Sequence, residues 1–186
     1  MDGKQKVSLD GKQKLLLLLF APSGGGFRVK RPRLVPRKVA VVQSSKGVMR
    51  FMEAVFVYGT LLTGESNYRV AAPFVRSVQP GAVYGRLYDC GLYPKLTLCG
   101  EGESELRPVV VGEWLEVSKA GLRAMDVLEG YRGPGKDNEY ERVWITDARD
   151  GGRSGWIYVG ADVQGLPLIP GGSWRGHRAL CEGRLP

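Results

Sequence analysis

Two short segments of this 186-residue chain carry residue types that suit proton-transfer chemistry at a carbonyl group. VFVYGTLLTG, from Val55 to Gly64, has the pattern of a buried strand that ends in a glycine turn, where backbone N–H groups can point at a ligand. DVLEGY, from Asp126 to Tyr131, ends a helix-like segment and places one carboxylate, Glu129, directly before a glycine. Amide donors and one isolated acid are the smallest set of groups that such chemistry needs.

The turn after the first strand has the glycine spacing of a phosphate-binding loop but lacks its cation. GTLLTGES, residues 59–66, carries Glu65 where that loop requires a lysine, and a negative side chain there would repel phosphate. This argues against nucleotide binding. The N–H groups of Thr60 and Leu61, next to Gly59, remain able to hold a carboxylate or a developing oxyanion. The alternative is an ordinary tight turn.

Glu129 occupies an unfavourable place for an acid. In the last turn of a helix it faces the negative end of the helix dipole, which costs about 0.3–1 kcal/mol. Its neighbours Leu128, Gly130 and Tyr131 form an apolar setting that would raise its pKa toward the working range of a general base. The alternative is an exposed glutamate at a helix end. Asp126 is a weaker candidate, because it lies on a neighbouring helical face.

A third candidate is Tyr140, in the segment EYERVWI. Strand alternation places Tyr140, Arg142 and Trp144 on one face of the strand. A tyrosine hydroxyl that faces a pocket could orient a substrate; the alternative is a residue of an ordinary amphipathic strand.

Several kinds of catalytic site lack their usual residues in this sequence. The three cysteines, Cys90, Cys99 and Cys181, have no CxxC spacing, which argues against a disulfide framework and a zinc site. His177 is the single histidine, so metal catalysis and Ser–His or Cys–His triads lack their usual partner. We therefore expect no metal and no cofactor.

Short strands and one clear helix must position these candidates. Between Val117 and Gly130 the apolar spacing becomes helical, with Ser118 as the cap, and a second short helix is expected over Asn67–Phe74. This indicates the α+β class, a small mixed β-barrel of about five to seven strands with flanking helices. The expected strands are Ala54–Tyr58, Ala82–Cys90, Lys95–Cys99, Val109–Val117, Tyr140–Thr146 and Gly155–Val159.

Charge and composition divide the chain into three parts. Residues 1–50 hold 12 Lys and Arg against two Asp, whereas residues 51–186 hold 15 Lys and Arg against 17 Asp and Glu. We therefore expect a basic, disordered leader over residues 1–50, a domain over 51–160 and a C-terminal tail over 161–186, with Trp174 able to dock.

The role of the basic leader stays open. It could touch nucleic acid or anionic lipid, but the domain itself has no nucleic-acid footprint. The apolar run Leu15–Ala21 is too short to cross a bilayer, and its faint likeness to a signal peptide lacks a clean cleavage site. We expect a cytoplasmic protein without a membrane partner, with secretion as the alternative.

Four segments, in this order and spacing, carry a family resemblance. They are VYGTLLTGESN at Val57–Asn67, DVLEGY at Asp126–Tyr131, Tyr140 with Arg142, and WIYV at Trp156–Val159. Together they resemble the gamma-glutamylcyclotransferase-like family, in particular the gamma-glutamylamine cyclotransferases and their small bacterial relatives. The resemblance implies a small barrel with flanking helices and a cavity at one end. It also implies Glu129 as the catalytic acid/base and a substrate-binding loop of Tyr58, Gly59, Thr60 and Leu61, with Tyr140 shaping the pocket.

The implied reaction uses the substrate's own amine as the nucleophile. Glu129 would take a proton from the α-ammonium group, and the freed amine would attack the γ-carbonyl to give 5-oxoproline and a free amine or amino acid. The expected partner is therefore a small gamma-glutamyl compound, with the leaving amine and the oligomeric state unspecified. The segment Arg132–Asn138 is either a lid or a mobile loop. The alternative function is a non-catalytic module that binds a small molecule or peptide on the same scaffold.

Overall fold

The computed structural model describes residues 41–42, 50–100, 107–149, 151–160 and 162–183, so the leader expected over residues 1–50 lies almost entirely outside the described residues. All six expected strands are present, and the first two extend further toward their N-termini than the sequence predicts. The elements are β1 (Val41–Val42), β2 (Arg50–Val57), α1 (Tyr68–Ala71), the 3-10 helix η1 (Ala72–Phe74), β3 (Val75–Asp89), β4 (Pro94–Leu98), β5 (Val109–Ser118), α2 (Lys119–Leu128), β6 (Glu141–Thr146), β7 (Ser154–Val159) and α3 (Trp174–Cys181).

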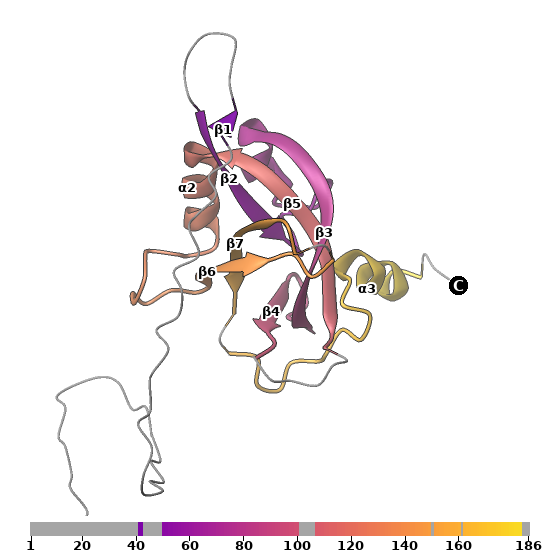
Figure 1. The fold of residues 1–186 in the computed structure, drawn as a ribbon. Coiled ribbons are helices and arrows are strands. Elements are labelled where there is room, and N and C mark those ends of the chain that lie inside the picture. The colour runs from indigo at the N-terminus through magenta and orange to yellow at the C-terminus, as the bar shows by residue number, and fades with distance from the viewer. Residues whose placement is uncertain (1–40, 43–49, 101–106, 150, 161, 184–186) are drawn as a thin grey trace, which may run out of the picture. The chain divides into compact units, whose positions relative to one another are not determined.

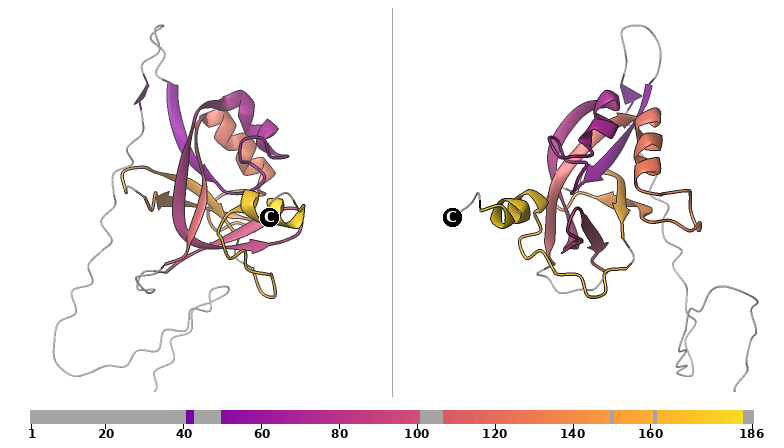
Figure 2. Two further views of the ribbon diagram at one scale, coloured as in Figure 1. Left: turned by 90° about the vertical axis from the view of Figure 1, so that its right-hand side faces the viewer. Right: turned by 180° about the vertical axis from the view of Figure 1, so that it is seen from behind.

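The strands form one curled sheet in the order β4-β3-β5-β2-β7-β6, with β1 paired to β2. Neighbours are antiparallel except β2 and β7, which run parallel. The N–H of Gly160, just after β7, donates to the Leu96 carbonyl on β4 at 3.1 Å and so draws the β4 edge toward β7. Figures 1 and 2 show the resulting half-barrel, with α1 and α2 side by side and α3 apart from them. The predicted α+β fold, a small barrel with flanking helices, is confirmed.

Helix α2 begins and ends where the sequence predicts. Ser118 caps its start by accepting a hydrogen bond at 3.3 Å from a backbone N–H of the first turn. The helix ends in a Schellman motif, in which the Tyr131 N–H donates to the Asp126 carbonyl at 2.8 Å and Gly130 adopts a φ of 62°. Because this motif fixes the path of the chain beyond the helix, it also fixes the position of the C-cap residue, Glu129.

Residues 161–186, expected as a tail, contain α3 and contribute to the hydrophobic core. Ile169 and Trp174 are only 3% and 2% exposed. The Val111 N–H of β5 donates to the Gly172 carbonyl at 2.9 Å, which holds the residues just before α3 against the sheet. Trp174 therefore docks on the barrel, and the packed structure continues well beyond residue 160.

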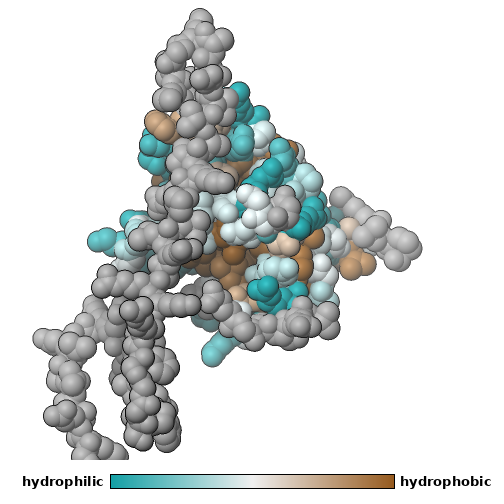
Figure 3. Space-filling model, in the orientation of Figure 1, coloured by the Kyte–Doolittle hydropathy of each residue, from teal (hydrophilic) through white to brown (hydrophobic). Residues whose placement is uncertain are grey.

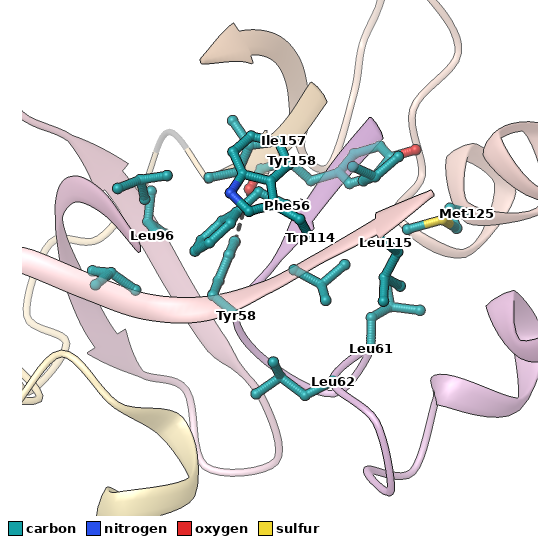
Figure 4. Packing of buried hydrophobic residues seen from close by; sticks show 14 of the residues in the cluster. Phe56, Tyr58, Leu61, Leu62, Leu96, Trp114, Leu115, Met125, Ile157 and Tyr158 are labelled. Carbon is teal, nitrogen blue, oxygen red and sulfur yellow. Dashed lines mark hydrogen bonds between the residues drawn. The ribbon is translucent and has the colours of Figure 1, made fainter. Parts of the chain in front are cut away.

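A ring contact to β5 and a hydrogen bond to the β7 backbone fix the end of β2. Figure 4 shows Phe56 on β2 beside Trp114 on β5, with ring centroids 5.2 Å apart in an edge-to-face arrangement. The Tyr58 hydroxyl donates to the Tyr158 carbonyl on β7 at 2.8 Å, drawn as the dashed line in Figure 4. The backbone that enters the candidate loop is therefore held on both sides.

The surface of the described residues is mixed in character. On the face seen in Figure 3, hydrophobic residues surface between hydrophilic ones. No helix in the described ranges has both the length and the apolar character needed to span a membrane.

A buried carboxylate, Asp147, ties the chain after β6 to the core. It is 8% exposed and accepts hydrogen bonds from Trp114 Nε1 at 2.5 Å, the Ala82 N–H at 3.2 Å and the Arg149 N–H at 2.7 Å. Burial alone raises the pKa of Asp147, but these hydrogen bonds outweigh burial and hold the pKa below its usual value. The carboxylate form therefore stabilises the fold.

We expect Asp147→Asn to lower the free energy of unfolding at pH 7 by about 1–2 kcal/mol, because one amide oxygen replaces a carboxylate that serves three donors. Chemical denaturation measures the loss. The loss should shrink as the pH falls below about 4, since a carboxyl group with a lowered pKa gives up its stabilising charge there. The exposed Asp137→Asn change is the control, and equal losses in both variants would contradict this role.

Candidate active site

One cavity of about 350 Å³ brings together the six residues that the sequence singled out. Its walls come from the end of β2 and the following loop, the turn between β3 and β4, the end of α2, the residues before β6, and β7. The six candidates in its lining are Tyr58, Gly59, Thr60, Leu61, Glu129 and Tyr140. Three segments that are far apart in the sequence therefore meet at one place.

The loop after β2 lines the cavity and contains two backbone donors without an internal acceptor. The carbonyl groups of Gly59 and Thr60 accept hydrogen bonds from the N–H groups of Leu62 and Asn67 at 3.0 and 2.9 Å. In contrast, the N–H groups of Thr60 and Leu61 have no acceptor among the described residues. A ligand oxygen in the cavity would satisfy donors that the protein leaves open.

Gly59 is required here by close packing. A Cβ atom at Gly59 would lie 2.7 Å from Cγ of Pro94 and 2.8 Å from its Cδ, so any larger residue would push the loop or the proline ring away. Both residues line the cavity. Glycine therefore lets the loop backbone approach the start of β4.

The far side of the same loop is braced by the C-terminal helix. Glu113 on β5 accepts a hydrogen bond from the Thr63 N–H at 2.8 Å and pairs with Arg175 of α3 at 2.8 Å. The Arg175 guanidinium also donates to the Thr63 carbonyl. On the cavity side, Asn67 donates to the Thr60 hydroxyl at 3.0 Å. The loop is thus anchored to β5 and α3, and α3 belongs to the part of the chain that the sequence predicted to be a tail.

Glu129 is the partly buried acid of the cavity. Burial and, to a lesser extent, the nearby Glu139 carboxylate raise its pKa from 4.5 to about 7. Its side chain has no hydrogen bond or ion pair with the described residues, which leaves both oxygens available to a ligand. At neutral pH such a group is close to half deprotonated, so it can both accept and return a proton.

Three tyrosines contribute hydroxyl groups with different partners. Burial is the main cause that raises the pKa of Tyr58, Tyr140 and Tyr158, so all three hydroxyls stay protonated at neutral pH. The Tyr58 hydroxyl is occupied by the β7 backbone, and the Tyr158 hydroxyl donates to Asp126 at 2.7 Å. The Tyr140 hydroxyl has no hydrogen-bond partner among the described residues. It is the one of the three that is free to contact a bound molecule.

Asp126, the other acid of DVLEGY, points away from this chemistry. It is absent from the cavity lining and pairs with Arg142 of β6 at 2.7 Å. The Arg142 guanidinium lies over the rings of Tyr131 and Trp156, with its central carbon 4.6 and 4.7 Å from the ring centroids. Asp126 thus fastens the last turn of α2 to the sheet, one helical turn before Glu129.

Sequence reasoning missed several contributions to the cavity, besides Pro94 described above. Glu139 and the turn residues Leu92 and Tyr93 also line it. Glu139 stands immediately before the candidate Tyr140, but no local pattern shows which neighbours of Tyr140 face the cavity. The segment Arg132–Asn138 contributes no lining residue.

The chemistry that this arrangement favours is proton transfer on a bound carbonyl compound. It offers open amide donors, one base with a pKa near neutrality and one free hydroxyl. Within the described ranges, no three His, Cys, Asp or Glu side chains are grouped so that they could hold a metal ion.

Comparison with known proteins supports the same kind of chemistry. The family model described as "Gamma-glutamyl cyclotransferase, AIG2-like" matches residues 55–176. The chain is 39% identical over 112 residues to gamma-L-glutamyl-butirosin B gamma-glutamyl cyclotransferase of Niallia circulans, an alignment that covers 59% of this chain and 67% of that protein. It is 33% identical over 123 residues to a putative gamma-glutamylcyclotransferase of Vibrio cholerae, covering 64% and 93% of the two chains.

Solved structures share the fold. YkqA of Bacillus subtilis aligns with a TM-score of 0.55 and 21% identity, over 72% of this chain and 43% of YkqA. The protein PH0828 of Pyrococcus horikoshii aligns with a TM-score of 0.54 and 15% identity, over 72% of this chain and 99% of PH0828. The family model covers more than half of the sequence and includes the loop, Glu129 and Tyr140. The chain therefore belongs to the gamma-glutamyl cyclotransferase, AIG2-like family and is an enzyme of the gamma-glutamylcyclotransferase type.

Proposed function

We propose that this enzyme converts gamma-glutamyl amides into 5-oxoproline and a free amine or amino acid. The observation that carries the proposal is that Glu129, with a pKa raised to about 7, shares a cavity with a loop whose Thr60 and Leu61 N–H groups have no internal acceptor. An acid/base and an oxyanion cradle suffice when the nucleophile belongs to the substrate. The relative from Niallia circulans, named as a gamma-glutamyl cyclotransferase, supports the same reaction class.

In the proposed mechanism Glu129 takes two protons, one after the other, from the substrate's α-nitrogen. Its carboxylate takes a proton from the substrate's α-ammonium group, and the freed nitrogen attacks the γ-carbonyl carbon to form a five-membered ring. The bond to the leaving nitrogen then breaks while the Glu129 carboxylic acid protonates that nitrogen. The regenerated carboxylate takes the second proton from the ring nitrogen, which becomes the neutral lactam N–H, and this proton passes to the released amine or to water. Such acid/base catalysis is worth about 10²–10⁴-fold in rate.

The loop and Tyr140 hold the substrate during these steps. When the amine attacks, negative charge grows on the γ-carbonyl oxygen. The open N–H groups of Thr60 and Leu61 are suited to stabilise this charge by donating hydrogen bonds to the oxygen. Each donor of this kind contributes about 10²–10³-fold. Gly59 allows the backbone to adopt this position against Pro94, Tyr58 anchors the start of the loop, and the Tyr140 hydroxyl can bind a polar group of the substrate.

A product assay with matched substrates tests the proposal. Gamma-glutamyl amides of several amines are incubated with the enzyme, and 5-oxoproline and free amine are quantified together. We expect the two products in equal amounts. The same amides acetylated on the α-nitrogen should give no product, because their nucleophile is blocked. Release of glutamate in place of 5-oxoproline would show hydrolysis by water and would contradict the proposal.

The pH profile should report the protonation of Glu129. Since the base must be ionised and its pKa is raised to about 7, kcat/KM should fall about tenfold per pH unit below 7 and level off above it. Measurements between pH 5 and 8.5 at constant ionic strength suffice. A rate that is constant over this range, or a midpoint near the usual glutamate value of 4.5, would count against Glu129 as the base.

A further inference from the structure

Glu139 is the second carboxylate in the cavity, and its place is fixed by the end of α2. Its backbone N–H donates to the Gly130 carbonyl at 3.4 Å. A Cβ atom at Gly130 would lie 2.8 Å from the Glu139 Cβ and 3.2 Å from its Oε2. The Glu139 side chain therefore lies over Gly130, the residue that follows Glu129. Any group bound beside Glu129 lies close to this second carboxylate.

The charge of Glu139 is not balanced within the described residues. Its neighbour Glu141 accepts a hydrogen bond from Asn138 at 2.9 Å, but Glu139 has no ion pair with a Lys, Arg or His of the described ranges. No Lys, Arg or His is found in the cavity lining described by the structure, and its two charged side chains are Glu129 and Glu139. Glu139 is exposed, so a bound cation would meet it at the cavity mouth.

Apolar side chains accompany this carboxylate around the cavity. Leu92 and Tyr93, on the turn between β3 and β4, line the cavity and are 87% and 39% exposed. An exposed leucine and tyrosine that line the same cavity as a carboxylate suit a molecule with an aliphatic stem and a positive end. A leaving group that carries a carboxylate would instead be repelled by Glu139.

We propose that Glu139 determines leaving-group specificity, favouring gamma-glutamyl amides whose amine bears a second positive charge on a short aliphatic chain. This inference rests on the proposed function. The leaving nitrogen must reach Glu129 to receive its proton, which places the rest of the amine between Glu139 and the Leu92–Tyr93 turn. Because Glu139 is solvent-exposed, we expect the charge preference to be about fivefold to tenfold.

Three amides of equal chain length measure this preference. Their leaving amines are 1,4-diaminobutane with a terminal cation, pentylamine with a neutral methyl end, and 5-aminopentanoate with a terminal anion. At low salt and pH 8.5, kcat/KM of the wild type should fall in that order. In Glu139→Gln the ratio of cationic to neutral substrate should drop about fivefold to tenfold, whereas the exposed control Asp137→Asn should keep the wild-type ratio. The pH lies above the expected Glu129 midpoint, so an altered Glu129 pKa does not affect the ratio.

Binding without turnover separates this inference from the reaction itself. The three amides are titrated into Glu129→Gln and into the double variant Glu129→Gln/Glu139→Gln by calorimetry. The single variant should bind the cationic amide more tightly than the neutral one, and the double variant should lose that difference. If the double variant loses the difference but the wild type releases no 5-oxoproline, the cation subsite stands and the proposed reaction fails. An unchanged ratio in Glu139→Gln, or an equal change in Asp137→Asn, would overturn the role of Glu139.

Discussion

Glu129→Gln is expected to fold normally and to lose nearly all turnover, with kcat lowered by about 10²–10⁴-fold. Glutamine keeps the size of the side chain but cannot take the proton of the substrate's ammonium group. The substitution breaks no hydrogen bond or ion pair to the described residues, so the loss should be chemical and not structural. Release of 5-oxoproline at saturating substrate measures kcat, and circular dichroism checks the fold.

The same variant should gain stability relative to the wild type as the pH rises. The pKa of Glu129 is raised from 4.5 to about 7 in the folded protein, so between these values the folded state binds more protons than the unfolded state. Wild-type stability therefore falls as the pH rises through this window, whereas the glutamine variant is insensitive to it. Melting temperatures at pH 5 and pH 8 test the sign. Glu116→Gln on β5, outside the cavity lining, is the matched control, and turnover of Glu129→Gln equal to the wild type would remove Glu129 from the mechanism.

The parts of the fold that the sequence predicts depend on local interactions. The cap of α2 at Ser118 and its stop at Gly130 involve hydrogen bonds between residues a few positions apart, so the pattern alone determines them. The strand that leads into Gly59 is recognisable because every residue from Val55 to Tyr58 is buried. Elements of this kind are specified by their own residues.

The parts that the sequence could not provide depend on contacts between distant segments. Pro94 lies 35 positions after Gly59 in the sequence, yet its ring is what requires a glycine there. Arg175 braces the loop after β2 from a helix more than a hundred residues later. A basic residue in a Gly- and Arg-rich stretch carries no sign of that role, which explains why residues 161–186 were expected to be a tail.

The two acids of DVLEGY carry the same carboxyl group but lie in different surroundings. Asp126 and Glu129 lie one helical turn apart, but Asp126 meets Arg142 and the Tyr158 hydroxyl, whereas Glu129 meets neither. The paired acid is held by its two partners on the sheet. The unpaired acid, desolvated and close to Glu139, acquires a pKa suited to proton transfer. The helix end that carries Glu129 is thus held by the acid one turn earlier.

We therefore expect Asp126→Asn to lower the stability of the fold more than it lowers the activity. The Asp126 and Arg142 side chains are 18% and 16% exposed. Removing the Asp126 charge therefore leaves the Arg142 guanidinium largely desolvated and without its partner. Breaking a buried pair in this way costs about 3–5 kcal/mol, and we expect the lower end because some solvent reaches both groups. Arg142 Nε already has no hydrogen-bond partner among the described residues, so the guanidinium depends more strongly on its ion pair with Asp126. Urea denaturation of both proteins at pH 7 measures the loss.

A double-mutant cycle with Arg142→Met distinguishes a true ion pair from general disruption of α2. If the stranded charge causes the instability, the double variant Asp126→Asn/Arg142→Met should be more stable than Asp126→Asn alone, with a coupling of about 1.5–3 kcal/mol. The more exposed pair of Arg178 with Glu182, whose side chains are 46% and 31% exposed, is the comparison, and Glu182→Gln should barely move the unfolding midpoint. Additive losses in the cycle would show that Asp126 acts without Arg142. At temperatures where Asp126→Asn is folded, its kcat should fall far less than that of Glu129→Gln, because the base itself remains in place.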